Sequence, residues 1–215
     1  MEIYDTEEEQ VAAIKRWWKE NGTSTIAGVV VGIVLIASWN VWESNVKEKG
    51  HQASALYDQL QISFSKDNIE SVQKLAEKIN SEHGDSAYAT YAALLLAKTK
   101  VQQNDLEAAK SILETQMNGA ESNALRNVAR LRFVRLLLAS GENEKGLQLI
   151  AEADQTAIKG FSASYDELKG DLYVELDRLG EARTAYQSAL RAGAKSPLLQ
   201  FKLDDVAAIE VVTAQ

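Results

Sequence analysis

The stretch YDELKGDLYVELDRLGEARTAYQSAL, from Tyr165 to Leu190, predicts two short helices joined by a turn. Its small and apolar positions with helical spacing are Leu168, Gly170, Tyr173, Ala182, Tyr186 and Ala189. The small residues Gly170 and Ala182 let the two helices approach each other closely, and Tyr173 and Tyr186 then fill the space between them. We therefore expect a helical hairpin here.

The second-helix pattern, a small residue followed four positions later by a large apolar one, recurs upstream. The pairs are Ser71 and Leu75, Ala108 and Ile112, Gly146 and Ile150, and Ala182 and Tyr186. The small positions lie 37, 38 and 36 residues apart, which is typical of helix-pair repeats. First helices are predicted at Ala53–Phe64, Tyr88–Val101 and Leu125–Ala139, and turns at Lys66–Asn68, Gln103–Asp105, Gly141–Asn143 and Leu179–Gly180. The alternative is an ordinary helical bundle with coincidental spacing.

These residues resemble tetratricopeptide repeats, most closely in the last copy. The resemblance implies an α-solenoid, a stack of helical hairpins with an extended concave surface on its first helices. Ser196–Pro197 begins a further helix, because Ser is a good N-cap and Pro suits the first helical position. This helix is expected to cover the end of the stack with Leu198, Leu199, Phe201 and Leu203. The predicted repeat domain spans residues 66–215.

An apolar segment precedes the repeats, and no residue between Glu20 and Glu43 is charged. The segment NGTSTIAGVVVGIVLIASWNVW forms a helix of roughly 30 Å, the thickness of a bilayer core. Tryptophans, which favour headgroup interfaces, border it at Trp17, Trp18, Trp39 and Trp42. We predict a short cytoplasmic tail at 1–22, a transmembrane helix at 23–42 and a juxtamembrane helix at 43–65 leading into the first repeat.

Two other readings of the apolar segment are a buried core helix of a soluble protein and a cleaved signal peptide. The chain begins with a long acidic stretch, whereas a signal peptide begins with a short basic one. Three basic residues precede the segment and two follow it: Lys15, Arg16, Lys19, Lys47 and Lys49. This bias favours a cytoplasmic N-terminus and a periplasmic C-terminal domain.

Small residues recur every four positions on one face of the predicted span, at Ser24, Gly28 and Gly32. Such spacing lets another helix approach closely, as in the GxxxG pattern, and Asn40 can add a hydrogen bond. We predict that this face packs against the membrane helix of a partner. The alternative is a chance occurrence, since glycine is common in transmembrane helices.

The composition of the chain argues against several classes of binding and catalytic site. The formal net charge is -8 and no basic stripe is present in the sequence, which argues against nucleic-acid binding. The chain has no cysteine, so disulfides and thiolate metal sites are excluded. His51 and His83 lack metal-ligand spacing, and no phosphate-binding or catalytic motif occurs. We therefore expect a binding protein with no catalytic, cofactor or metal site.

The whole combination of tail, anchor and repeats resembles the ancillary SecYEG translocon subunits of bacteria. The resemblance is most specific in EEEQVAAIKRWWKENG, Glu7–Gly22, and in LRFVRLLLASGENEKGLQLI, Leu131–Ile150. It implies a single-pass inner-membrane protein with a cytoplasmic N-terminus and a periplasmic repeat domain. The implied partners are the Sec translocon, a membrane-anchored periplasmic chaperone of the prolyl-isomerase class, and exported polypeptides handed on to chaperones. An envelope-stress signalling regulator and an organelle-surface receptor are the alternatives.

Overall fold

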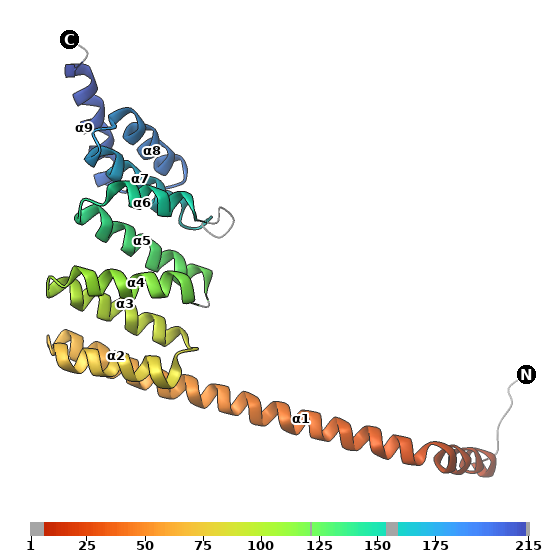
Figure 1. Cartoon of the computed structure of the whole chain (residues 1–215). Helices are drawn as coiled ribbons and strands as arrows, with labels where there is room; N and C mark the ends of the chain where they lie inside the picture. Colours follow the sequence, from red (N-terminus) through yellow and green to blue (C-terminus); the bar gives the residue numbers. More distant parts are fainter. Residues whose placement is uncertain (1–6, 121, 154–158, 214–215) are drawn as a thin grey trace, which may run out of the picture. The chain divides into compact units, whose positions relative to one another are not determined.

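The computed structural model describes the backbone of residues 7–120, 122–153 and 159–213, and side chains between residues 9 and 207 within these ranges. The regular structure of this part of the chain is entirely α-helical, which confirms the predicted fold class (Figure 1). The chain divides into two compact units, residues 1–52 and 53–215. The helices are α1 Glu7–Ser65, α2 Ile69–His83, α3 Ala87–Gln102, α4 Leu106–Gly119, α5 Asn123–Ala139, α6 Asn143–Ala151, α7 Ser162–Glu175, α8 Leu179–Arg191 and α9 Pro197–Thr213.

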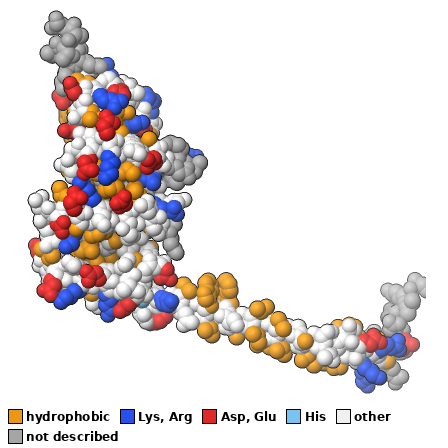
Figure 2. Space-filling view, in the orientation of Figure 1, with side chains coloured by type: hydrophobic (Ala, Val, Ile, Leu, Met, Phe, Trp, Pro, Cys, Tyr) orange, Lys and Arg blue, Asp and Glu red, His pale blue; other side chains and the backbone are white. Residues whose placement is uncertain are grey.

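Residues 7–52 of the first unit belong to the continuous helix α1, which contains both the predicted span at 23–42 and the predicted juxtamembrane segment at 43–65. Its large apolar side chains are exposed, from Ile26 at 53% to Trp42 at 58%, and Figure 2 shows them along the visible face of the helix. Among the described residues, α1 is the one helix long and apolar enough to cross a membrane. An apolar helix without protein cover requires another apolar environment.

The second unit is a succession of hairpins, in which the final part of α1 from residue 53 serves as the first helix of the first pair (Figure 1). Neighbouring helices along the chain pack on one another from α2 to α9, and α5 also packs on α7. Buried apolar side chains form successive clusters, each drawn from consecutive helices; the largest buried members include Ile79, Phe133, Leu172 and Tyr186. The predicted stack of hairpins is therefore present.

Each hairpin turn contains one residue with a left-handed backbone. These residues are Asp67, Asn104, Gly141 and Asp177, with φ of 53°, 60°, 74° and 56°. They lie 37, 37 and 36 residues apart. In every turn the following N–H donates to the carbonyl five residues earlier, at 2.8–3.0 Å, which satisfies a carbonyl at the end of the first helix. Asp and Asn tolerate this conformation better than most residues.

The prediction for the last turn was wrong by a few residues. The turn lies between Glu175 and Leu179, and Leu179 and Gly180 already belong to α8. The reason is that Asp177, rather than the glycine, adopts the left-handed conformation. The first two predicted turns coincide with the observed ones, and the third lies one residue late, because Asn143 already belongs to α6.

Ion pairs connect consecutive repeats near the turns. Lys110 on α4 donates to Glu142, which precedes α6, and this hydrogen bond raises the pKa of Lys110 and lowers the pKa of Glu142. Arg178, which precedes α8, lies 3.6 Å from Glu144 on α6. These contacts join a second helix to the turn of the next hairpin, and so they help to fix the register of the stack.

Helix α9 covers the end of the stack and begins at Pro197, as predicted. Leu199 and Val206 are buried against Ala182 and Tyr186, with Leu203 half-buried beside them. The Lys202 ammonium contacts two carboxylates on α7, Glu167 at 2.9 Å and Asp171 at 2.8 Å. Burial acts to lower the pKa of Lys202, but hydrogen bonds to Asp171 and Glu167 outweigh it and raise that pKa.

Two predicted capping residues do not cover the stack. Leu198 is 59% exposed and Phe201 is 70% exposed. A helix presents only one face to the hairpin beneath it, and the spacing of Leu199, Leu203 and Val206 selects the opposite face for burial.

Candidate binding site

A groove of about 220 Å³ lies between α3 and α5, the first helices of the second and third hairpins. Its floor is formed by Leu94, Ala97 and Leu113, which are at most 5% exposed. Val101 and Leu136 extend the apolar lining, and the exposed cations Lys98, Arg132 and Arg135 complete it. The groove therefore combines an apolar floor with positive charge.

The three cations of the groove differ in the contacts that they make with the rest of the chain. Arg132 donates from Nη1 to the carbonyl oxygen of Leu94 at 3.3 Å, which joins α5 to α3. The Lys98 ammonium lies 4.9 Å from the centre of the Phe64 ring. Arg135 and Lys98 form no ion pair in the described part of the chain. Both charges are consequently available to a ligand.

Aromatic side chains extend the same first-helix surface toward the first hairpin. The rings of Tyr57, Tyr88 and Tyr91 form a cluster with centroid separations of 5.8, 5.9 and 6.1 Å. Tyr91 is 39% exposed and lies two helical turns before Lys98, on the same face of α3. We call the groove together with this cluster the first-helix surface.

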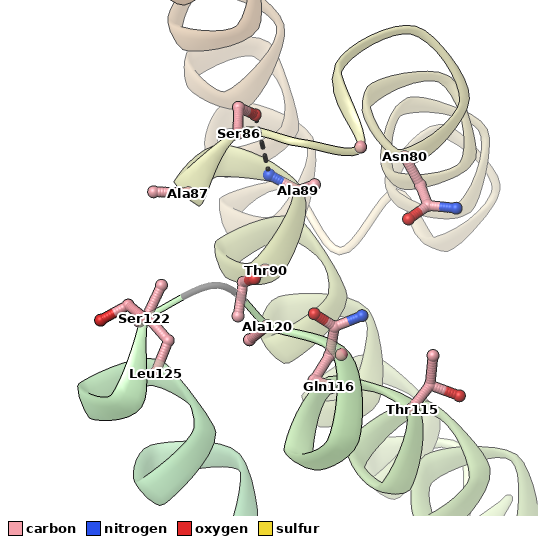
Figure 3. A pocket seen from close by; sticks show the side chains of 12 residues that line it. Asn80, Ser86, Ala87, Ala89, Thr90, Thr115, Gln116, Ala120, Ser122 and Leu125 are labelled. Atoms are coloured by element: carbon pink, nitrogen blue, oxygen red, sulfur yellow. Dashed lines mark hydrogen bonds between the residues drawn. The ribbon is translucent and has the colours of Figure 1, made fainter. Parts of the chain in front are cut away.

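A second hollow, also of about 220 Å³, lies where α2 and α4 end and α3 and α5 begin (Figure 3). Its polar lining consists of Asn80, Ser86, Thr90, Thr115, Gln116 and Ser122. The Ser86 hydroxyl accepts a hydrogen bond from the Ala89 N–H at 3.3 Å and caps α3. The described residues of the lining include no titratable side chain, and they offer hydrogen bonds to a ligand.

The last hairpin packs around a glycine. A Cβ atom on Gly170 would lie 2.3 Å from a ring carbon of Tyr186, closer than atoms can approach. The Tyr186 hydroxyl donates to Asp171 at 2.8 Å, and burial together with this hydrogen bond raises the pKa of Tyr186. Tyr173 lies at the edge of the same core, with the Arg178 guanidinium 4.6 Å from its ring centre. Tyr186 is thus buried in the hairpin, whereas Tyr173 is partly buried at its margin.

This repeated hairpin geometry has a match among known families. The family model described as a tetratricopeptide repeat-like domain matches residues 15–208. The chain belongs to this tetratricopeptide repeat-like family. The match begins within α1 and extends into α9, so it includes the apolar segment at 23–42 as well as the repeats.

Curated relatives of this tetratricopeptide repeat-like chain are named "Ancillary SecYEG translocon subunit". The relative from Escherichia coli (strain K12) is 27% identical over 209 residues, covering 96% of this chain and 99% of the relative. Those from Aggregatibacter actinomycetemcomitans and Haemophilus influenzae are each 28% identical, covering 93% and 89% of this chain and 97% and 93% of the relatives. These relatives confirm the predicted resemblance. Together, the names of the relatives and the long apolar helix fit a protein that crosses the inner membrane once.

The repeat-packing residues predicted in the tetratricopeptide repeat-like stack fall in two registers. Gly146, Ile150, Ala182 and Tyr186 are buried. Each small residue lies five positions, and each large residue nine positions, after the left-handed residue of its turn. Ser71 and Ala108 are only half-buried, as are Leu75 and Ile112, which pack at the margins of their cores. The residues equivalent to Gly146 are instead Val72 and Ala109, each one position later and fully buried.

The predicted packing face of the anchor is uncovered in this chain. A Cβ atom on Gly28 or Gly32 would meet no atom within 4 Å. Ser24 is exposed and donates its hydroxyl hydrogen bond to the carbonyl of Asn21 at 3.0 Å, and Asn40 is exposed. The face is thus free along the helix, and its use by a partner stays a prediction.

The sequence reasoning missed the groove residues Lys98, Arg132 and Arg135. They lie on helices 34 or more positions apart in the chain, and only the stacking of α5 beside α3 brings them together. A signal was nonetheless present, because neither α3 nor α5 contains an acidic residue.

Proposed function

We propose that this chain is a membrane-anchored protein-binding subunit that associates with the Sec translocon. The observation that carries the proposal is the union of two parts in one chain: a long exposed apolar helix and a tetratricopeptide repeat-like stack. The relatives named as translocon subunits support the assignment along nearly their full length. Helix-pair stacks bind polypeptides on the surface formed by their first helices.

The proposed arrangement has the N-terminus in the cytoplasm and the repeat domain in the periplasm. The three basic residues before the span against two after it support this orientation. The anchor confines the first-helix surface to the membrane plane, which raises its effective concentration beside the export channel. The proposed consequence is that emerging polypeptides bind here and pass to periplasmic chaperones, one of them a membrane-anchored chaperone of the prolyl-isomerase class.

The test of translocon association is co-purification of the full-length chain from native membranes in a mild detergent. The control variant carries an unrelated apolar helix in place of residues 23–42. We expect the native chain to retain the translocon subunits and the control to lose a substantial share of them. Equal absence of these subunits from both samples would contradict the proposal.

Orientation has a separate test, which uses the absence of cysteine from the chain. A single cysteine in place of Gln215 can be labelled with a membrane-impermeant maleimide. We expect labelling in cells with a permeabilised outer membrane and an intact inner membrane. Labelling that requires disruption of the inner membrane would place the repeat domain in the cytosol, as in a cytosolic receptor.

A further inference from the structure

The two helices that bound the groove have an unusual charge. Helices α3 and α5 together contain two lysines and four arginines and no acidic residue. The whole chain has the opposite balance, with 31 acidic and 23 basic residues. The second helix α2, by contrast, contains Glu70, Glu77 and Glu82 beside two lysines. Positive charge is therefore concentrated on the two neighbouring first helices α3 and α5, in a protein that is acidic as a whole.

Part of this charge has structural partners. Lys100 lies 3.9 Å from Asp105 and donates to Gln73 at 3.4 Å, on the side of α3 away from the groove. Arg130 lies near the Tyr165 hydroxyl. Burial raises the pKa of Tyr165, and the positive charge of Arg130 partly offsets this rise. Lys98 and Arg135 line the groove, are exposed and have no acidic partner among the described residues. Their charge is not neutralised by the described part of the chain.

We propose that this groove binds a polypeptide segment in which a large apolar side chain is flanked by carboxylates. The apolar side chain enters the hollow above Leu94 and Ala97, and the carboxylates lie beside Lys98 and Arg135. The groove, at about 220 Å³, has room for one such side chain. The inference rests on the proposed function as a protein-binding module, and it names the kind of segment that the module selects.

Charge complementarity and the shape of the groove both favour a peptide over a lipid surface. Basic groups attract acidic segments and repel basic ones, which gives selectivity as well as faster association. Headgroups in a flat membrane surface contact exposed cations, but they do not use a floor that is at most 5% exposed. A peptide side chain uses both features, because burial of apolar area adds to the charge interaction.

The experiment measures binding of fluorescent, end-capped peptides to the full-length chain in nanodiscs of zwitterionic lipid. One peptide carries aspartate and glutamate around leucine and phenylalanine, and its matched partner carries lysine at the acidic positions. We expect the acidic peptide to bind about tenfold more tightly, with a preference that shrinks as salt rises. Equal affinity for the two peptides would overturn the proposal.

Variants locate the site. Arg135→Glu should weaken binding of the acidic peptide about tenfold, because it replaces an attraction with a repulsion at the groove. The control Lys78→Glu makes the same change of net charge at an exposed position on α2, and it should leave binding within about twofold. Equal losses in both variants, or none in Arg135→Glu, would contradict the groove assignment.

Two further outcomes separate the competing explanations. If anionic lipid in the nanodisc abolishes peptide binding to the native chain but not to Arg135→Glu, the groove binds lipid and the proposal fails. The assay contains no translocon, so loss of peptide selectivity does not affect the co-purification result. Conversely, the peptide preference can hold even when translocon association fails.

Discussion

Two glycines of the repeats and two glycines of the anchor differ in what surrounds them. Gly170 and Gly146 are close to side chains of their own chain: an added Cβ would lie 2.3 Å from Tyr186 in one case and 2.9 Å from Leu172 in the other. Gly28 and Gly32, on the anchor, have no atom within 4 Å of such a Cβ. Gly146 and Gly170 thus each have an identified neighbour within the repeats, whereas Gly28 and Gly32 in the anchor leave space for a molecule outside the chain.

The same contrast holds for large apolar side chains. In the repeats, Tyr165, Leu172 and Leu199 are at most 1% exposed, because consecutive helices enclose them. In the anchor, Val31 and Ile36 are 57% and 65% exposed. Burial of apolar area stabilises a fold wherever that area is removed from water. The repeat domain achieves this burial within itself, and the anchor requires lipid and, we propose, a partner helix.

The largest expected effect comes from filling the empty face of the anchor. Replacing both Gly28 and Gly32 with leucine should remove a substantial share of the co-purifying translocon subunits, since the bulk prevents close helix approach. The repeat domain should unfold at an unchanged denaturant concentration, because these glycines contact none of it. The matched control replaces Val30 and Val34, on the opposite face, with leucine. Retention of the partner by the glycine variant would show that this face does not dock.

Adding a methyl group where the repeats are already closely packed should instead lower the stability of the fold. Gly170→Ala forces the Tyr186 ring to move and should lower the free energy of unfolding by about 2 kcal/mol, as overpacking does. Urea unfolding of the full-length chain in nonionic detergent, followed by circular dichroism, measures it. Gly119→Ala, which meets open space, serves as the control. Equal stability of native and Gly170→Ala chains would refute the close packing described for this hairpin.

A smaller, opposite effect is expected at the turns. Asp177 has a φ of 56°, which an L-residue adopts at a cost, so Asp177→Gly should stabilise the chain by about 0.5–1 kcal/mol. Gly141 is the left-handed residue of the equivalent turn, and Gly141→Asp should lower the free energy of unfolding by a similar amount. The same urea titration measures both. Destabilisation by Asp177→Gly would mean that the aspartate side chain has a role that the backbone does not explain.

The smallest effect concerns the ion pair between Lys110 and Glu142. The hydrogen bond from Lys110 lowers the pKa of Glu142 from its ordinary value of 4.5. A lowered folded-state pKa contributes stability that is present above pH 4.5 and is lost as the pH falls through the folded-state pKa. Glu142→Gln should therefore flatten the decline of melting temperature below pH 4.5, while Glu114→Gln, at an exposed position, should not. Parallel acid profiles for all three chains would contradict this pairing.

In the last hairpin the sequence showed which residues pack together, although not where the turn lies. Gly170 and Ala182 are small residues at helical spacing and Tyr186 is large, and the Tyr186 ring lies against Gly170. The earlier repeats are rich in alanine and leucine, so small-then-large pairs occur in two adjacent registers. Ala108 with Ile112 and Ala109 with Leu113 both fit this pattern, and only the turn geometry at Asn104 shows which pair is buried.

The groove was beyond sequence reasoning for another reason. Its cations belong to helices of different repeats, and their convergence depends on how α5 stacks beside α3. Helical spacing shows which residues share a face of one helix, but it does not show which faces meet. The anchor was easier, since length, absence of charge and bordering tryptophans are properties of a single continuous segment.

The central claim is that an uncleaved apolar helix holds the repeat stack at a membrane. The most direct measurement is alkaline carbonate extraction of membranes containing the chain with a C-terminal tag, combined with intact mass determination of the tagged protein. Our account predicts that the tagged protein sediments with the lipid and has the mass of a chain that retains residues 23–42. Release into the supernatant without detergent, or a mass that lacks this segment, would contradict it.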